Sequence, residues 1–220
     1  MHTIATSLYN TLLKLISPPF CARCGGFLSK RLILCEACRQ RIQPVVSTTV
    51  PVTKKYQITL LALCRYEEPI KSLVLAKSRR DHVASAQIGQ LVWELTNLKN
   101  MPFDCIVPIP LHWRRFAERG YNQSYEMARI IAQKSDKPIV NALRRTTHRP
   151  FQSQVNQKQR QENVRGAFTV HSRHKNLITG KRILIVDDLF TTGATMKTAA
   201  RELVRARPAQ LIAIVACRTS

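Results

Sequence analysis

Short apolar blocks recur along the chain, separated by segments in which apolar and polar residues alternate with a different spacing. The blocks are rich in β-branched residues and have few polar interruptions, which is typical of strands buried on both faces of a parallel sheet. They predict strands at residues 58–66, 104–110, 183–186 and 211–217, and a weaker block predicts one at 141–145.

The intervening segments carry apolar residues three or four positions apart, the spacing of one face of a helix. They predict helices at 69–77, 83–98, 124–134 and 196–207. Strands that alternate with helices indicate an α/β fold, in which a parallel sheet is flanked by helices. Residues 42–57 contain two prolines with several valines and threonines, so we expect a linker there.

The chain of 220 residues is strongly basic, with 35 lysines and arginines against 13 acidic residues and a net charge of +22. Because 45% of the residues are apolar, global disorder is excluded. A charge excess of this size indicates a polyanionic partner, nucleic acid before membrane. A basic pocket for a polyphosphate ligand is the alternative, and it would account for only part of the excess.

No apolar run approaches the roughly 18 residues of a membrane span, so we expect no membrane-spanning segment. The first 20 residues place apolar side chains at helical spacing, but Lys14 interrupts them and no basic segment comes before them. We therefore expect a short amphipathic helix rather than a signal peptide, and a cytoplasmic protein. The odd count of seven cysteines agrees, because a secreted disulfide framework favours an even number.

Four of the cysteines form two C-x-x-C pairs that are ten residues apart. Each pair suits a tight turn that points two thiolates at one ion, and two pairs complete a tetrahedral structural zinc site. Paired disulfides and a redox C-x-x-C are the competing interpretations. We expect residues 1–45 to form an N-terminal helix with this zinc module and residues 46–220 to form the main domain. The predicted zinc ligands are Cys21, Cys24, Cys35 and Cys38.

The segment 183–195 reads Ile-Leu-Ile-Val-Asp-Asp-Leu-Phe-Thr-Thr-Gly-Ala-Thr. A strand, two acids, a tight turn and a helix follow one another, and this layout offers backbone N–H groups and a helix N-terminus to an anion. Gly193 lets the backbone approach a ligand closely. The two acids suit ribose hydroxyls or a metal ion carried by the ligand, so a sugar phosphate fits the layout. An ordinary buried strand with a helix cap is the simpler alternative.

This segment resembles the fingerprint of the type I phosphoribosyltransferases, which bind phosphoribosyl pyrophosphate (PRPP). The resemblance implies that Asp187 and Asp188 are the catalytic acids and hold the 2′- and 3′-hydroxyls of the ribose, with Mg²⁺ arriving on PRPP. It also implies that the 5′-phosphate is bound by Thr191, Thr192, Gly193, Ala194 and Thr195.

Residues 107–123 resemble the signature of the ComF (competence protein F) family, with the sequence Val-Pro-Ile-Pro-Leu-His-Trp-Arg-Arg-Phe-Ala-Glu-Arg-Gly-Tyr-Asn-Gln. The four-cysteine module and the Arg-Pro-Phe-Gln at 149–152 match the same family in order. The family usually has proline where Trp113 stands, and its lysine segment usually continues differently from the Ser-Arg-Arg-Asp at 78–81.

Residues 148–165 are polar and rich in glutamine, which favours a mobile loop. Its position fits the flexible loop that closes over PRPP in type I phosphoribosyltransferases. The arginines that follow the strand at 104–110, Arg119 included, are expected near the same crevice, with a solvated face as the alternative. The candidates for contacts to pyrophosphate or for the flexible loop are Lys77, His112, Arg114, Arg115, Arg149, Gln152, Arg160 and Asn163.

Two functions follow from these resemblances. We expect a PRPP-binding protein of the ComF type that acts in natural competence, with single-stranded DNA and proteins of the competence machinery as partners. The alternative is a salvage phosphoribosyltransferase for a nucleobase or a related acceptor. No segment marks an acceptor pocket or a general base, so it stays open whether transfer to an acceptor is catalysed.

Overall fold

The computed structural model describes residues 20–29, 32–76, 82–146 and 166–219, and its centre is a five-stranded sheet of order β1-β2-β7-β6-β3. β1 is antiparallel to β2, and the other neighbours are parallel. The predicted α/β fold with a mainly parallel sheet is therefore confirmed. The strands are β1 (Val45–Pro51), β2 (Gln57–Arg65), β3 (Cys105–Pro108), β6 (Arg182–Phe190) and β7 (Gln210–Arg218).

A second, two-stranded sheet lies beside the main one and pairs β4 (Leu143–Arg145) with β5 (Phe168–Val170) in antiparallel order. Two short 3-10 helices, η2 (Asn97–Asn100) and η3 (Ser172–His174), join other elements. The α-helices are α2 (Glu36–Arg39), α3 (Ile70–Ala76), α4 (His82–Leu95), α5 (Trp113–Arg119), α6 (Gln123–Ser135), α8 (Lys175–Ile178) and α9 (Ala194–Val204).

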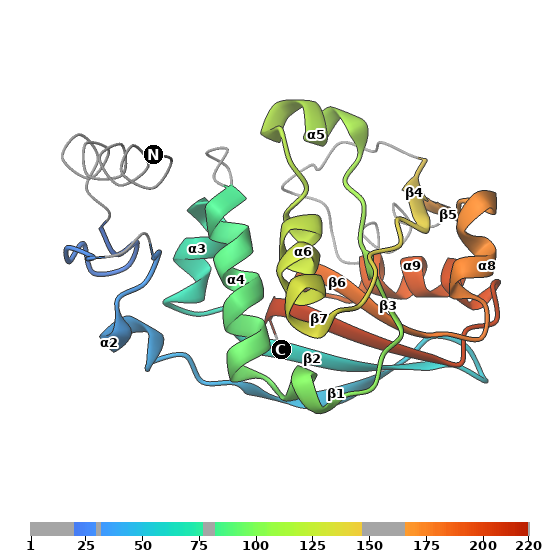
Figure 1. Ribbon diagram of the computed structural model, residues 1–220, viewed down its shortest axis with the longest axis horizontal. Helices are drawn as coiled ribbons and strands as arrows, with labels where there is room; N and C mark the ends of the chain where they lie inside the picture. The colour runs from blue at the N-terminus through green and yellow to red at the C-terminus, as the bar shows by residue number, and fades with distance from the viewer. Residues whose placement is uncertain (1–19, 30–31, 77–81, 147–165, 220) are drawn as a thin grey trace, which may run out of the picture.

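The two faces of the main sheet are covered by different elements (Figure 1). On one face Leu184 of β6 belongs to a core that α3, α4 and α6 complete. On the other face its neighbour Ile185 packs in a core with α8, α9, β4 and β5. Successive strand residues point to opposite faces, so a strand buried on both faces must be apolar throughout, as the sequence of β6 is.

The helices α4 and α6 approach closely because Gly89 lies between them. A Cβ atom at Gly89 would come within 2.9 Å of the backbone of Met127. This contact fixes α6 against the sheet, with its first residues at the carboxyl ends of the parallel strands. At the opposite end of the sheet, where the parallel strands begin, Asp104 joins the starts of β3 and β6. Its Oδ1 lies 2.7 Å from Nη2 of Arg182, and its Oδ2 accepts the Arg182 backbone N–H at 2.8 Å.

Three differences from the sequence-based expectation concern the main sheet and the segment after β3. The predicted linker at 42–57 is wrong for residues 45–51, which pair with β2 as an edge strand. The sequence does not reveal this strand, because the segment contains prolines and most of the strand's side chains are exposed. The arginine-rich segment after β3, expected as a loop, forms α5. Finally, β6 continues to Phe190 instead of ending before the two acids, because β7 pairs with it over that whole length.

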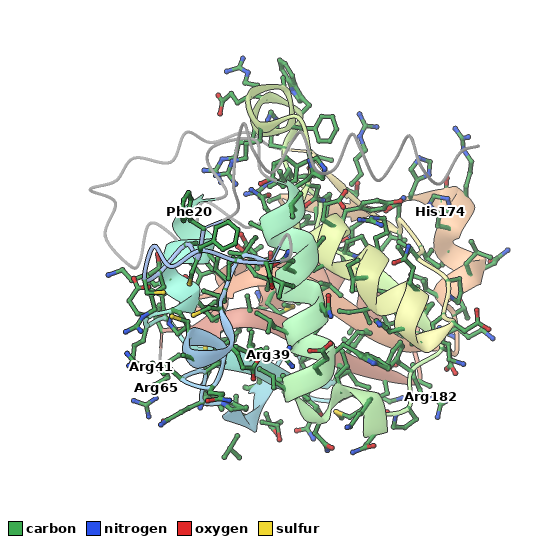
Figure 2. All side chains as sticks on the ribbon, turned by 60° about the vertical axis from the view of Figure 1, so that its left-hand side comes forward. Phe20, Arg39, Arg41, Arg65, His174 and Arg182 are labelled. Carbon is green, nitrogen blue, oxygen red and sulfur yellow. The ribbon has the colours of Figure 1, made fainter. Side chains whose placement is uncertain are left out.

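The cysteine-bearing segment, residues 20–29 and 32–42, packs against α3 and α4 at the end of the molecule opposite α8 (Figure 1). Arg39 donates to Glu94 of α4 at 2.7 Å, and it lies beside that helix in Figure 2. The backbone N–H of Ile33 donates to Oε1 of Gln87, also on α4. The predicted helix in residues 1–20 lies, apart from Phe20, outside the described residues, and the division of the chain at residue 45 stays a prediction. Within the described ranges, no helix combines the length and apolar character that crossing a bilayer requires.

Candidate functional site

The two acids of the predicted site lie where β6 extends beyond the end of its neighbour β3. The pairing of these strands ends at Pro108, whose partner is Val186. Asp187 and Asp188 follow directly, so one side of β6 is open at this point while the other side still pairs with β7. Ligands of open α/β sheets bind at this carboxyl end of the strands.

Asp187 is buried, with 8% of its surface exposed, and Asp188 is half-buried. Oδ1 of Asp187 accepts two hydrogen bonds, from the backbone N–H of Asp188 at 2.9 Å and from the hydroxyl of Ser124 at 3.0 Å. Burial, followed by the negative charge of Asp188, raises the pKa of Asp187 to about 8. Hydroxyl donors or a cation from a ligand would favour its ionised form.

Ser124 is placed by the cap of α6. Oδ1 of Asn122 accepts the Ser124 backbone N–H at 3.1 Å, and Nδ2 of Asn122 donates to the carbonyl of Ile109 at 3.0 Å. The cap therefore ties the first turn of α6 to the chain just after β3. The sequence analysis missed Ser124, since its only signal is a capping asparagine two residues earlier, and nothing in the sequence links it to Asp187.

The turn after the acids has the predicted strand–turn–helix layout. Gly193 has φ +73°, and a Cβ atom there would lie 2.6 Å from the ring of Phe190, so the turn requires glycine. Oγ1 of Thr192 accepts the backbone N–H of Ala194 at 3.4 Å, at the start of α9. The positive end of the α9 dipole thus follows the acid pair by a few residues.

The predicted basic residues after β3 have different surroundings. His112 is buried and caps α5, and its Nδ1 accepts the backbone N–H of Arg114 at 3.3 Å. The guanidinium of Arg114 lies 5.3 Å from the centre of the Trp113 ring, on the exposed side of α5. Arg115 and Arg119 are half-buried on the same helix. The structure gives His112 a capping role, and the ligand contacts of these residues stay predictions.

Arg145, at the end of β4, belongs to the electrostatic surroundings of the acid pair, and the sequence analysis gave it no role. Burial lowers the pKa of Arg145, the positive charge of Arg115 lowers it further, and Asp187 acts in the opposite direction. The other predicted contacts lie outside the described residues, as does nearly all of the expected loop at 148–165; they are Lys77, Arg149, Gln152, Arg160 and Asn163.

The four predicted zinc ligands converge. Their sulfur atoms all lie within 4.8 Å of one another, and those of Cys24 and Cys35 are 3.7 Å apart. A tetrahedral zinc site with Zn–S bonds of about 2.3 Å has sulfur–sulfur edges of about 3.8 Å, so the cluster could hold such an ion. Burial would raise the pKa of Cys21, but backbone N–H groups of Cys24, Cys35 and Arg23 outweigh it and lower the pKa to about 6, which favours a thiolate there. Burial raises the pKa of Cys38 to about 11, so only part of the cluster favours thiolates without an ion.

Known proteins match this chain at the level of the domain and of the whole chain. The phosphoribosyl transferase domain model matches residues 121–220. The DNA utilization protein YhgH of Escherichia coli K12 is 30% identical over 210 residues, which cover 90% of this chain and 84% of that protein. Competence protein F of Haemophilus influenzae is 25% identical over 84% of this chain and 78% of its own. Competence protein ComFC of Bacillus subtilis is 24% identical, and the match covers 78% of this chain and 78% of that protein. Together with the α/β fold and the cysteine cluster, these matches show that the chain belongs to the competence protein F (ComF) family and carries its phosphoribosyltransferase-like domain.

Proposed function

We propose that the protein binds PRPP at the carboxyl end of β6 and acts in natural competence, in the handling of single-stranded DNA. The observation that carries the PRPP proposal is the acid pair on the open side of β6, followed at once by a glycine turn and a helix N-terminus. Asp187 and Asp188 would accept hydrogen bonds from the ribose hydroxyls, and residues 191–195 would receive the 5′-phosphate.

The competence role is supported by the relatives. Those reported above are named for competence or for DNA utilization, which favours this role over nucleobase salvage. The net charge of +22 supports a polyanionic partner beyond PRPP itself. We place this activity in the cytoplasm, together with proteins of the competence machinery.

If transfer occurs, it displaces pyrophosphate from C1 of the ribose, and positive charge develops on the sugar ring. Asp187 and Asp188 would lie against the hydroxyl side of that ring, where their negative charge favours the developing cation. Their carboxylate oxygens also suit a hard cation, and Mg²⁺ bound with PRPP would neutralise charge on the leaving pyrophosphate. Ser124 would keep Asp187 oriented through its hydrogen bond.

We further propose that Cys21, Cys24, Cys35 and Cys38 bind a structural zinc ion. Four thiolates leave no open coordination position, so the ion would hold the segment together without taking part in chemistry.

The test is the shift in melting temperature on adding PRPP with Mg²⁺. A ligand that binds the folded state raises this temperature by mass action. We expect a shift in the wild type and none in the Asp187→Asn/Asp188→Asn double variant. Asp136→Asn is the control, because it removes an exposed acid at the end of α6, far from the acid pair, where asparagine suits a φ of +54°. An equal shift in the double variant would refute the ribose assignment.

A further inference from the structure

A cavity of about 730 Å³ lies beside the acid pair, between α5, the start of α6 and β4. Four aromatic side chains line it: Trp113, Phe116, Tyr121 and Tyr125. Three of them are unusually exposed for their size, with 66% of the surface of Trp113, 50% of Phe116 and 37% of Tyr125 open to solvent. We call these four residues the aromatic pocket. A cluster of exposed aromatic rings around one cavity indicates a surface that a ligand covers.

The wall opposite these rings is polar and incompletely satisfied. Nε of Arg145 and Nδ1 of His171 are buried, and neither has a hydrogen-bond partner among the described residues. Both side chains pack against a neighbouring ring: the guanidinium of Arg145 lies 5.4 Å from the centre of the Phe168 ring, and the ring centres of His171 and His174 are 5.2 Å apart. Buried polar atoms are almost always paired, so these two nitrogens leave the wall unsatisfied. Neither nitrogen is exposed to the cavity, and the positive charge of Arg145 is what the wall offers to the acceptor atoms of a ligand.

The cavity adjoins the proposed PRPP site. Asn122 lines it and also caps α6, and two residues later Ser124 donates to Asp187. Arg145 lines it from β4, and its charge interacts with that of Asp187. A planar ring stacked on the aromatic residues, with acceptors facing Arg145, would therefore lie next to the sugar-phosphate site.

We propose that the aromatic pocket holds an unstacked base of single-stranded DNA beside the PRPP site. This proposal rests on the DNA-handling part of the proposed function and adds the place where a base is bound. A strand fits better than a free base for two reasons. The rim formed by Trp113 and Phe116 is open, so a base can enter while still attached to its chain. Arg144 is exposed at the same cavity, and the chain carries a charge of +22 that suits the phosphates.

The experiment compares two labelled oligonucleotides of equal length, about 12 nucleotides, by fluorescence anisotropy. One is oligothymidine, and the other carries abasic sites and so has the same phosphates without bases. We expect the wild type to bind oligothymidine about tenfold more tightly, the size of one good base–aromatic stack. Trp113→Ala/Tyr125→Ala should remove this preference, and Trp113→Phe/Tyr125→Phe should retain most of it, because the rings remain.

Two results would overturn the proposal. Equal affinity of the wild type for both oligonucleotides would mean that DNA is held by its phosphates alone, and the proposed function would still stand. Quenching of tryptophan fluorescence by free adenine or thymine, with no preference for oligothymidine over the abasic strand, would assign the pocket to a small molecule. Binding of neither oligonucleotide would instead contradict the DNA-handling function itself. An unchanged PRPP-induced shift in the alanine variant would show that it is folded.

Discussion

Among single residues, Asp187 is the one whose burial lowers the stability of the ligand-free protein while its carboxylate suits a ligand. Its raised pKa means that the folded protein binds this proton more tightly than the unfolded chain does. The folded state is therefore favoured below the ordinary pKa of aspartate, and this contribution is lost as pH rises from about 4 towards the pKa in the folded protein. A buried acid that weakens the fold at neutral pH is the kind of residue that a ligand site retains.

Asp187→Asn should therefore stabilise the ligand-free protein at pH 8. The amide oxygen can still accept from Ser124 and Asp188, while the buried charge disappears. We expect a gain on the order of a few kcal/mol in the free energy of unfolding, measured with urea, and a smaller gain at pH 5, where the buried carboxyl is mostly protonated. A loss of stability at pH 8 would mean that the buried carboxylate of Asp187 does not lower the free energy of unfolding.

Gly193 combines a positive φ with a close approach to the ring of Phe190. Gly193→Ala should destabilise the protein through both its positive φ and the clash with Phe190, by more than about 1 kcal/mol. Gly120→Ala is the matched control, because Gly120 has φ +79° but open space where the Cβ would lie. Urea unfolding should show a larger loss at position 193. Equal losses would show that the Phe190 ring moves aside without cost.

The sequence allowed the acid pair and Gly193 to be singled out because they lie within one contiguous pattern. Ser124 and Arg145 could not be found in this way. Ser124 reaches Asp187 across 63 residues, and the burial of Arg145 depends on β4 and β5 packing over the sheet. Contacts of this kind depend on tertiary packing, which leaves no local pattern in the sequence.

At the scale of elements, the core strands were predictable because burial on both faces demands unbroken apolar runs. The edge strand β1 was not, since four of its seven residues in succession are exposed and its pattern resembles a linker. The helix α5 was hidden for a related reason: none of its residues is buried, so no apolar face marks it. Exposed elements therefore leave no apolar pattern in the sequence from which they could be predicted.

The four cysteines of the cysteine-bearing segment can be tested by substitution. Cys21→Ser should lower the zinc content, measured by elemental analysis, and should also lower the melting temperature of the whole protein, because this segment shares its apolar core with α3 and α4. The PRPP-induced shift should remain, since the acid pair lies elsewhere. Cys105→Ala is the control, a buried cysteine outside the cluster, and should keep its zinc. Full zinc content in Cys21→Ser would contradict four-thiolate binding.

At the scale of the whole molecule, the net charge was evident from composition, but its placement was not. Arg218 and Arg65 are register partners at the carboxyl ends of β7 and β2. Arg65 and Arg41 line one cavity of about 410 Å³ between the sheet and the cysteine-bearing segment, and Figure 2 shows them close together. Glu67 and Glu68 line the same cavity, so its charge is mixed, and the two arginines are the groups there that could contact a nucleic-acid backbone.

The salt dependence of DNA binding tests this contact. For a single strand, the slope of log affinity against log salt is near −0.7 for each phosphate neutralised. Arg41→Ala/Arg65→Ala should therefore reduce the slope by roughly 1.4. Lys99→Ala/Lys134→Ala, which removes two exposed charges from η2 and the far end of α6, should leave it unchanged. Equal slopes for all three proteins would place the DNA on another surface.

We propose that the carboxyl end of β6 binds an activated sugar phosphate. The most direct measurement is a crystal structure of the protein soaked with PRPP and Mg²⁺. We expect density for PRPP with its ribose against Asp187 and Asp188 and its 5′-phosphate in the turn at 191–195. Ordered PRPP at any other place, with this end of the sheet empty, would contradict it.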